Sequence, residues 1–362
     1  MFLLTADNAE QYLRQSGRIA LREQVAVREL KGGVSNLVLY VDRSEGADFV
    51  LKQSRDRLRV ADEWLCPLER IWREAEVLRI CDQLLCRGGD SDLDAAPHDD
   101  GPSLAIGTPA IVFEDRENYV LAITAAAPDH TVWKSDLLAG RADPRIAEAC
   151  GDLLARLHAG SWLSRGIAQR IGDRSLFEQL RLDPYYRTAA ARRPEFRAPL
   201  DALYRSVWDH PLALVHADFS PKNLLVSPQT LMMVDFETGH FGDPAFDLGF
   251  FLSHLVLKTV YHAPSHLPML ALIDAFWARY EPRLLGRIGG DEYRSLVARG
   301  LQNLAGCAVA RLDGKSPVEY LESAPRRDAV RRLAGAIFNH PPNTWAELRD
   351  AVDAVCATLA GE

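Results

Sequence analysis

The sequence predicts an α+β protein with two lobes, a small β-rich lobe followed by a larger, mainly helical one. A chain of 362 residues is too long for one small hydrophobic core. β-Prone runs gather in the first third of the chain, whereas helical periodicity dominates after Gly249. We therefore expect lobes at residues 1–123 and 124–362, with the boundary in the segment of small residues at 124–128.

The elements of the small lobe are predicted from β-branched and aromatic runs bounded by turn-forming residues. One helix packs on these strands, because Trp72, Ala75, Leu78 and Cys81 recur at helical spacing. Residues 87–103 are rich in Gly, Asp and Pro without apolar periodicity, which is typical of a mobile surface loop. A first helix at 5–17 is followed by a five-stranded antiparallel sheet of strands at 25–30, 37–41, 49–52, 110–113 and 119–123, with its helix at 69–78.

Composition excludes several classes of function. The formal net charge is -8, so no basic excess is available to neutralise nucleic-acid phosphates, and an acidic chain suits a cationic small substrate. The six cysteines form no CxxC pair and no zinc-like cluster, which is typical of free thiols in a reducing cytoplasm. Charges interrupt the longest apolar run, 246–260, so it predicts a buried helix and no membrane span. We expect a cytoplasmic monomer or homodimer without a signal peptide.

Polar residues follow each predicted strand in the segment 212–235. Because these strands are neighbours in a hairpin-like unit, their polar side chains can converge on one point. Two carboxylates and a carboxamide are oxygen ligands that suit Mg²⁺. The alternative is a surface hairpin whose acids cap turns. The polar residues expected to converge are His216, Asp218, Asn223 and Asp235, which lie beside strands predicted at 212–215, 223–226 and 231–234.

The small lobe offers groups that suit a nucleotide. Gly32, Gly33, Ser35 and Asn36 lie between the first two strands. Glycines let the backbone approach phosphate oxygens, and Ser and Asn add hydrogen-bond donors. A Gly-Gly pair is equally typical of a plain hairpin turn. Lys52 ends the third strand between apolar neighbours, where its ammonium could be held in place, although a lysine at a strand end can also be a plain surface residue.

With these residues in place, the chain resembles the aminoglycoside phosphotransferase and choline kinase family, a branch of the kinase-like superfamily that includes methylthioribose kinase. The resemblance covers about residues 25–257 and implies a two-lobed protein-kinase-like fold. The chain departs from protein kinases at Ser220, where they carry a lysine. It also leaves no room for a long activation loop. The motifs that carry it are GGVSN, VLK, REAEVL, VHADFSPKN, VDFE and GDPAFDLG.

The resemblance implies a role for each of these residues. Asp218 would accept the proton of a substrate hydroxyl that attacks the γ-phosphate of ATP. Asn223 and Asp235 would hold Mg²⁺ against the phosphates, and His216 would brace the loop. Lys52 would bind the α- and β-phosphates. The acid that steadies Lys52 is Glu74, with Glu76 in reserve.

Other polar residues receive structural interpretations. We expect Asp247 to bond the loop backbone near His216, Asp243 to form a turn before Pro244, and His158 to be a core histidine. A capping box over Ser316-Pro317-Val318-Glu319 predicts the start of a helix. The candidate substrate residues, for each of which a structural role is the alternative, are Glu237, His254, Lys258, Arg311 and Asp313, with Asp183, Tyr185 and Tyr186 as looser candidates.

The predicted function is an ATP- and Mg²⁺-dependent kinase that phosphorylates a hydroxyl of a small molecule such as an aminoglycoside, an amino alcohol or a sugar. No readable motif encodes the acceptor. A nucleotide-binding pseudokinase or regulatory module is the non-enzymatic alternative. A protein kinase or nucleotidyl transferase on the same scaffold is the other enzymatic one.

Overall fold

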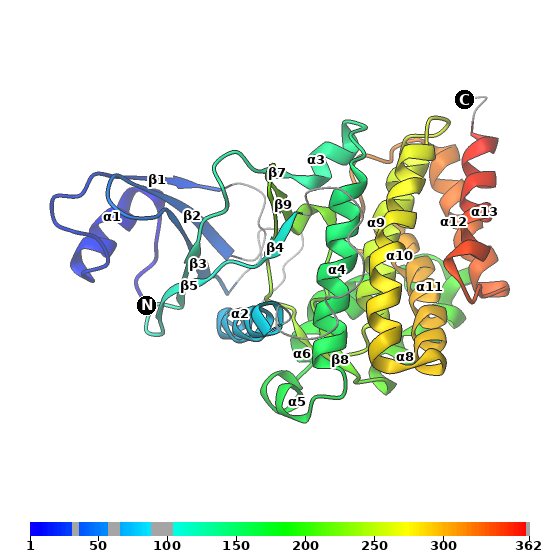
Figure 1. The fold of residues 1–362 in the computed structure, drawn as a ribbon, viewed down its shortest axis with the longest axis horizontal. Coiled ribbons are helices and arrows are strands. Elements are labelled where there is room, and N and C mark those ends of the chain that lie inside the picture. Colours follow the sequence, from blue (N-terminus) through cyan, green and yellow to red (C-terminus); the bar gives the residue numbers. More distant parts are fainter. Residues whose placement is uncertain (31–35, 57–65, 88–103, 360–362) are drawn as a thin grey trace.

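The computed structural model describes residues 1–30, 36–56, 66–87 and 104–359. A β-rich part forms one end of the molecule, and a stack of long helices fills the other end, where the C-terminus lies (Figure 1). The predicted α+β class is confirmed. The division at residues 123 and 124 stays a prediction, and Gly32, Gly33, Ser35 and residues 88–103 lie outside the described residues.

The small part is built on the expected five-stranded antiparallel sheet, in the order β1-β2-β3-β6-β5. Leu39, Leu51 and Ala122 stand side by side on its central strands and pack with helix α1 in a small core. Lys52 follows Leu51, so its side chain leaves the opposite face of the sheet. The elements are α1 (Ala6–Gln15), β1 (Val25–Glu29), β2 (Asn36–Arg43), β3 (Phe49–Ser54), β5 (Ile111–Asp115) and β6 (Val120–Thr124).

Helix α2 (Arg70–Arg87) lies on that opposite face and joins the sheet to the helical part. Its residues Ile71, Ala75 and Leu78 are buried in the main hydrophobic core, together with side chains from the sheet and from the long helices. Continuous apolar burial across this junction holds the sheet and the helical part together. Glu74 of α2 is thereby placed at a fixed position beside Lys52.

The helical part is organised around α9 (Ala245–Tyr261), which is buried over almost its whole length, as predicted for residues 246–260. A Cβ added at Gly249 would lie 2.5 Å from the Cβ of Asn303, so only glycine lets α9 and α11 approach so closely. None of the helices in the described part of the chain is long and apolar enough to cross a membrane. The other long helices are α4 (Pro144–Ser161), α8 (Arg197–Asp209), α10 (Leu267–Ile288), α11 (Gly290–Asp313), α12 (Ala324–Asn339) and α13 (Trp345–Thr358), and the shorter ones are α3 (Trp133–Leu138), α5 (Arg165–Ile171), α6 (Ser175–Phe177), the π-helix η2 (Glu178–Arg187), α7 (Thr188–Arg192) and the 3₁₀ turns η3 (Pro194–Phe196) and η4 (Pro221–Asn223).

Two further small sheets form in the described part of the chain. One has the order β4-β10-β9-β7, and its β9–β10 pair is the predicted antiparallel hairpin. The other pairs β8 with β11. The strands are β4 (Ala105–Gly107), β7 (Thr131–Val132), β8 (Ala213–Val215), β9 (Leu224–Val226), β10 (Thr230–Met233) and β11 (His240–Gly242).

The predicted helix start at Ser316 is wrong. Helix α12 begins at Ala324, and its N-cap is Ser323, whose side chain accepts the Arg326 N–H. The hydroxyl and carbonyl of Ser316 instead accept hydrogen bonds from Arg311, and the Val318 N–H donates to the Arg311 carbonyl at 2.7 Å. The segment therefore folds back over the end of α11, and its capping-box residues serve no helix.

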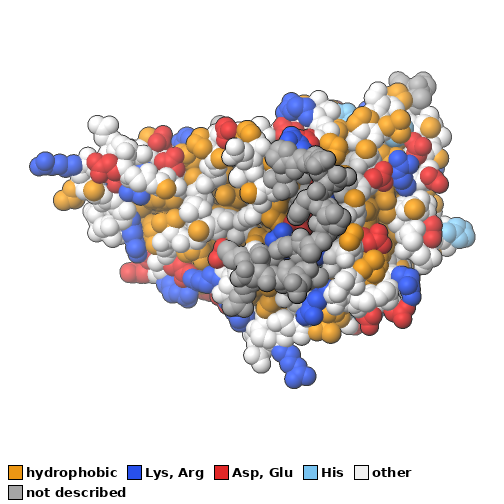
Figure 2. Space-filling view, in the orientation of Figure 1, with side chains coloured by type: hydrophobic (Ala, Val, Ile, Leu, Met, Phe, Trp, Pro, Cys, Tyr) orange, Lys and Arg blue, Asp and Glu red, His pale blue; other side chains and the backbone are white. Residues whose placement is uncertain are grey.

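Charged side chains of both signs are interspersed over the described part of the face shown in Figure 2. This pattern agrees with the net charge of -8. Local charge therefore has to be judged at the site itself.

Candidate active site

The loop after β8 is held by Asp247 at the start of α9. One carboxylate oxygen of Asp247 accepts the His216 N–H and the other accepts the Ala217 N–H, both at 2.7 Å. Ala217 has a φ of 63°, in the left-handed region, where a residue with a Cβ loses about 1–2 kcal/mol. Two charge-assisted hydrogen bonds offset this strain. The prediction that Asp247 bonds the backbone near His216 is confirmed.

His216 braces the same turn from its side chain. Its Nδ1 accepts the Asp218 N–H at 3.1 Å, and the Thr238 hydroxyl donates to the His216 carbonyl at 3.1 Å. Burial lowers the pKa of His216, so the ring is neutral at pH 7. Its Nε2 is buried without a hydrogen-bond partner among the described residues. The geometry supports a bracing role.

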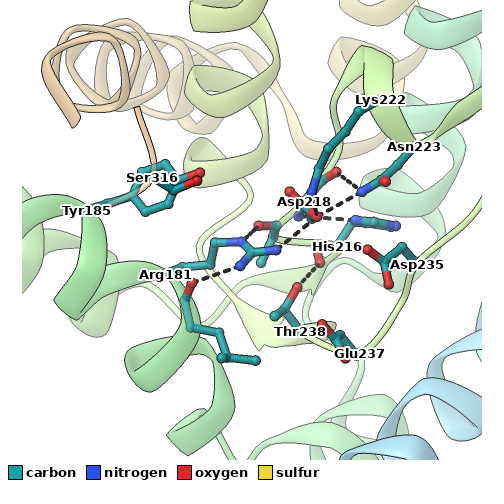
Figure 3. Close-up of polar contacts among 12 residues, drawn as sticks. Arg181, Tyr185, His216, Asp218, Lys222, Asn223, Asp235, Glu237, Thr238 and Ser316 are labelled. Atoms are coloured by element: carbon teal, nitrogen blue, oxygen red, sulfur yellow. Dashed lines mark hydrogen bonds and ion pairs between the residues drawn. The ribbon is translucent and has the colours of Figure 1, made fainter. Parts of the chain in front are cut away.

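Asp218 stands at the centre of the site with 2% of its surface exposed (Figure 3). The Asn223 amide donates to Oδ2 at 2.8 Å, and the same oxygen lies 2.9 Å from the Arg181 guanidinium and 2.8 Å from the Lys222 ammonium. Burial alone would raise the pKa of Asp218, but Arg181 and Lys222 outweigh it and lower the pKa to about 2. Asp218 is therefore fully ionised at neutral pH.

Sequence reasoning missed both cations that hold Asp218. Arg181 belongs to the π-helix η2, which contains Pro184, and its Nε also donates to the Ala217 carbonyl at 2.8 Å. No motif marks an arginine so far upstream. Lys222 did leave a signal, because it directly precedes Asn223. Its ammonium reaches Asp218 from the η4 turn, two positions after Ser220.

Lys52 leaves β3 toward α2, and its ammonium contacts the Glu74 carboxylate and lies 3.4 Å from Asp235 Oδ1. Burial favours the neutral amine, but Glu74 and Asp235 outweigh it and raise the pKa of Lys52. The reserve acid Glu76 binds Arg170 at 2.6 Å instead. The geometry thus selects Glu74 as the partner of Lys52.

Asp235 follows β10 with a φ of 73°, a strained conformation typical of functional positions. Its side chain is 29% exposed, far more than that of Asp218. Burial would raise its pKa, but Lys52 and Lys222 outweigh this and lower it. Asp235 therefore presents an ionised carboxylate that the solvent reaches.

The remaining predicted residues are divided between places in the fold. Asn36 and Arg70 both donate to the Glu237 carboxylate at 3.3 Å. Asn36, a candidate for nucleotide binding, and Glu237, a candidate for substrate binding, therefore contact each other. Asp313 forms an ion pair with Arg331 at 2.8 Å. His254, Lys258 and Arg311 line one cavity together with Lys134, Lys222 and Tyr320.

The looser candidates and the structural residues lie in packing positions. The hydroxyl of Tyr185 lies 3.3 Å from Arg311, and Tyr186 donates to Asn303 at 2.6 Å in the core. Asp183 pairs with Arg187 at 2.8 Å. Asp243 accepts the Ala245 N–H at the start of α9, as a turn former does, and also pairs with Arg299 at 2.9 Å. His158 is buried and bonds Tyr280 at 2.9 Å, which confirms it as a core histidine.

The residues present fit a Mg²⁺ ion that is bound together with phosphates. Asn223 uses its amide nitrogen toward Asp218, which leaves its amide oxygen as the ligand atom. Within the described ranges, no three His, Cys, Asp or Glu residues gather closely enough to form a metal cage. Magnesium is usually bound by one or two carboxylates plus substrate phosphates, so Asn223 and Asp235 suffice only if a nucleotide supplies the rest.

Comparison with known proteins places the chain in a family. The family model described as "Phosphotransferase enzyme family" matches residues 26–296. A methylthioribose kinase of Cronobacter sakazakii is 26% identical over 75% of this chain and 70% of its own length. Methylthioribose kinase 2 of Oryza sativa is 24% identical over 67% of this chain and 58% of its own length.

A solved structure supports the fold. An amicoumacin kinase in complex with AMP-PNP, Ca²⁺ and Ami superposes with a TM-score of 0.53 over 93% of this chain and 95% of that chain, at 14% identity. The predicted kinase-like fold and phosphotransferase class are confirmed, and the family implies the use of ATP. The chain belongs to the phosphotransferase enzyme family.

Proposed function

We propose that the protein transfers the γ-phosphoryl group of ATP to a hydroxyl of a small molecule, with Mg²⁺ as the metal. The observation that carries this proposal is the setting of Asp218. Its ionised carboxylate is fixed by Arg181, Lys222 and Asn223, and Asp235 and Lys52 lie beside it in one continuous polar site. Such a site can orient an acceptor hydroxyl next to a phosphate.

In the proposed reaction, the acceptor oxygen forms a bond to the γ-phosphorus while the bond from phosphorus to the ADP oxygen breaks. Asp218 accepts the hydrogen bond of the acceptor hydroxyl and then its proton. A carboxylate with a pKa near 2 is a weak base, so its first task is to orient the hydroxyl, and the proton follows once the new bond has advanced. This order suits the loose transition state of phosphoryl transfer.

The nucleotide would be held on the side of Asp218 where Lys52 and Glu74 lie. Lys52, charged and fixed by Glu74, is suited to the α- and β-phosphates. Asn36 stays a candidate for the same phosphates, as do Gly32, Gly33 and Ser35, which lie outside the described residues. Asn223, through its amide oxygen, and Asp235 would hold Mg²⁺, which would neutralise charge on the phosphates. A cytoplasmic location remains a prediction, supported by the free thiols of the five described cysteines.

The alternatives have less support. A nucleotide-binding pseudokinase would not need the carboxylate assigned to the acceptor hydroxyl, yet Asp218 is present and is held ionised. Between Asp235 and the start of α9 at Ala245 lie only one tight turn and the short strand β11. This spacing leaves no segment of the length that protein kinases use to bind a polypeptide substrate.

Two measurements test the proposal. Calorimetry with ATP should show binding that depends on Mg²⁺, and a hundredfold excess over Kd should add about 2.7 kcal/mol to the free energy of unfolding. Equal affinity in Mg²⁺ and in EDTA would show that the metal assignment is wrong. A panel of hydroxyl compounds, followed by ADP release, should contain an acceptor that raises ADP formation above slow ATP hydrolysis. Nucleotide binding without transfer to any of a broad panel would favour the pseudokinase alternative.

A further inference from the structure

A small cavity beside Asp218 is lined by cationic side chains from four parts of the fold. Lys134 comes from α3, Lys222 from η4, and Lys258 from α9. Arg311 at the end of α11 and Tyr320 from the segment that folds back over it complete the wall with His254. None of the described residues that line it is acidic.

Two of the cations have carboxylate partners outside the cavity wall. The ammonium of Lys222 lies 2.8 Å from Asp218. That of Lys134 contacts Glu319, which is more than half exposed. These two positive charges are therefore already compensated, and Lys222 connects the cavity directly to the carboxylate that we assign to the acceptor hydroxyl.

Lys258 has no such compensation. It is 1% exposed, donates one hydrogen bond to the His254 carbonyl at 3.3 Å, and lies 5.1 Å from the ring centre of Tyr320. No carboxylate of the described chain lies within ion-pair distance of its ammonium. Burying an ammonium whose single hydrogen-bond acceptor is neutral costs free energy. A partner that the chain does not supply would offset this cost.

Other donors in the same cavity also lack acceptors. The Nε of Arg311 and the hydroxyl of Tyr320 are both buried without a hydrogen-bond partner in the described structure. Burial, followed by the charges of Lys134 and Arg311, lowers the pKa of Lys258 to about 7. One anionic group placed among these three side chains would satisfy all of them and would stabilise the charged lysine.

We propose that this cavity binds an anionic group, a carboxylate or a phosphate, of the acceptor whose hydroxyl is phosphorylated at Asp218. The inference rests on the proposed function, because that function places the reacting hydroxyl at Asp218. It makes the acceptor an acidic hydroxy compound, which is the opposite of the cationic substrate suggested by the net charge of the chain. Net charge describes the whole surface, whereas Lys258 and Arg311 act within a few ångströms of the ligand.

The test measures binding without turnover. The protein is first saturated with Mg²⁺ and AMP-PNP, so that the nucleotide phosphates occupy their own site. Malonate, neutral malonamide and cationic 1,3-diaminopropane, which share one three-carbon frame, are then titrated by calorimetry. We expect malonate to bind and the other two not to bind. A parallel titration with inorganic phosphate shows which of the two anionic groups binds more tightly.

Variants locate the site. Lys258→Met should weaken malonate binding at least tenfold, and Tyr320→Phe, which removes only one hydroxyl, should weaken it about threefold and serves if Lys258→Met does not fold. Lys315→Met is the matched control, since it removes one positive charge near the same segment from a residue that does not line the cavity. It should leave the affinity unchanged.

Several outcomes would overturn the proposal. They are tight binding of 1,3-diaminopropane, absence of malonate and phosphate binding, competition between malonate and the nucleotide, or an unchanged affinity in both cavity variants. Each of these can occur while ADP release from a neutral or cationic acceptor still demonstrates the kinase. Conversely, anion binding at Lys258 without phosphoryl transfer to any hydroxyl compound, whether acidic, neutral or cationic, would contradict the proposed function while leaving the anion site intact.

Discussion

The two sides of Asp218 treat positive charge differently. On the side of the β sheet, Lys52 is buried with Glu74 and has Asp235 as a second acid, so its charge is compensated by the protein itself. On the side of α9 and α11, Lys258 and Arg311 have no carboxylate partner in the described chain. Lys222, which lines the cavity of the second side, lies 2.8 Å from Asp218, the carboxylate proposed to bind the acceptor hydroxyl.

This difference indicates how each side is prepared for its ligand. An ion pair formed within the protein fixes a lysine before the nucleotide arrives, which lowers the cost of organising the site during the reaction. An uncompensated cation stores an unfavourable desolvation energy that only a complementary ligand relieves. A nucleotide used in every turnover suits the first arrangement, and discrimination among acceptors suits the second.

The largest expected effect comes from Asp218, the residue shared by both sides. Asp218→Asn keeps the shape of the side chain but removes its charge and basicity, so turnover on the true acceptor should fall about 10²–10⁴-fold. Nucleotide affinity should change little, because Lys52 and the metal ligands remain. Steady-state kinetics and calorimetry separate the two quantities.

Asp235→Asn provides the matched comparison for Asp218→Asn. It removes a charge from the metal side, so it should weaken binding of Mg·ATP as well as turnover. If Asp218→Asn retains nearly full turnover, the mechanism proposed for this site is wrong. If the two variants behave identically, the distinction between the two sides of Asp218 is lost.

The next effect concerns the ion pair on the nucleotide side. Lys52→Ala should weaken nucleotide binding about 10–100-fold, the usual value of hydrogen bonds to charged groups, and Glu74→Ala should weaken it less. Because Glu74 acts through Lys52, the double variant should be little worse than Lys52→Ala. Glu76→Ala is the control, since Glu76 binds Arg170 at the surface. Strictly additive losses in the double variant would exclude the pairing.

Much of this architecture was predictable from local sequence signals. Alternation of apolar residues indicated the sheet that carries Lys52, and the spacing of His216, Asp218, Asn223 and Asp235 indicated that these residues would meet. These signals work because each depends on the period of one strand or on one short turn. The interpretation of Asp247 also succeeded, since it lies at a helix start close to the loop that it holds.

Other features could not be predicted, because they depend on tertiary packing. Arg181 reaches Asp218 only because a π-helix aims it there, and no periodic pattern reveals a π-helix. The helix expected at Ser316 failed because Arg311 competes for the groups that would have capped it. The cavity around Lys258 joins α3, η4, α9 and α11, and its charge is opposite in sign to that of the whole chain.

The two buried lysines, Lys52 and Lys258, differ in how they make the stability of the protein depend on pH. The pKa of Lys258 is lowered to about 7 in the folded protein, whereas an unfolded lysine titrates near 10.5. Between pH 7 and 10 the unfolded chain thus binds more protons at this residue, so its contribution makes stability rise with pH. The pKa of Lys52 is raised instead, so Lys52 is protonated in both states over this range and contributes no slope.

Urea unfolding at pH 7, 8 and 9 tests this contrast. The free energy of unfolding of the wild type minus that of Lys258→Met should rise with pH, with a slope approaching about 1.4 kcal/mol per pH unit. The same difference taken with Lys52→Met should stay flat. The other titratable groups at the cavity are the same in both proteins, so their own contribution cancels in the difference. Saturating malonate should flatten the Lys258 curve, because a bound anion restores the pKa of the lysine. A flat curve without malonate would show that the charge of Lys258 is already compensated, and the contrast between the two sides of Asp218 would disappear.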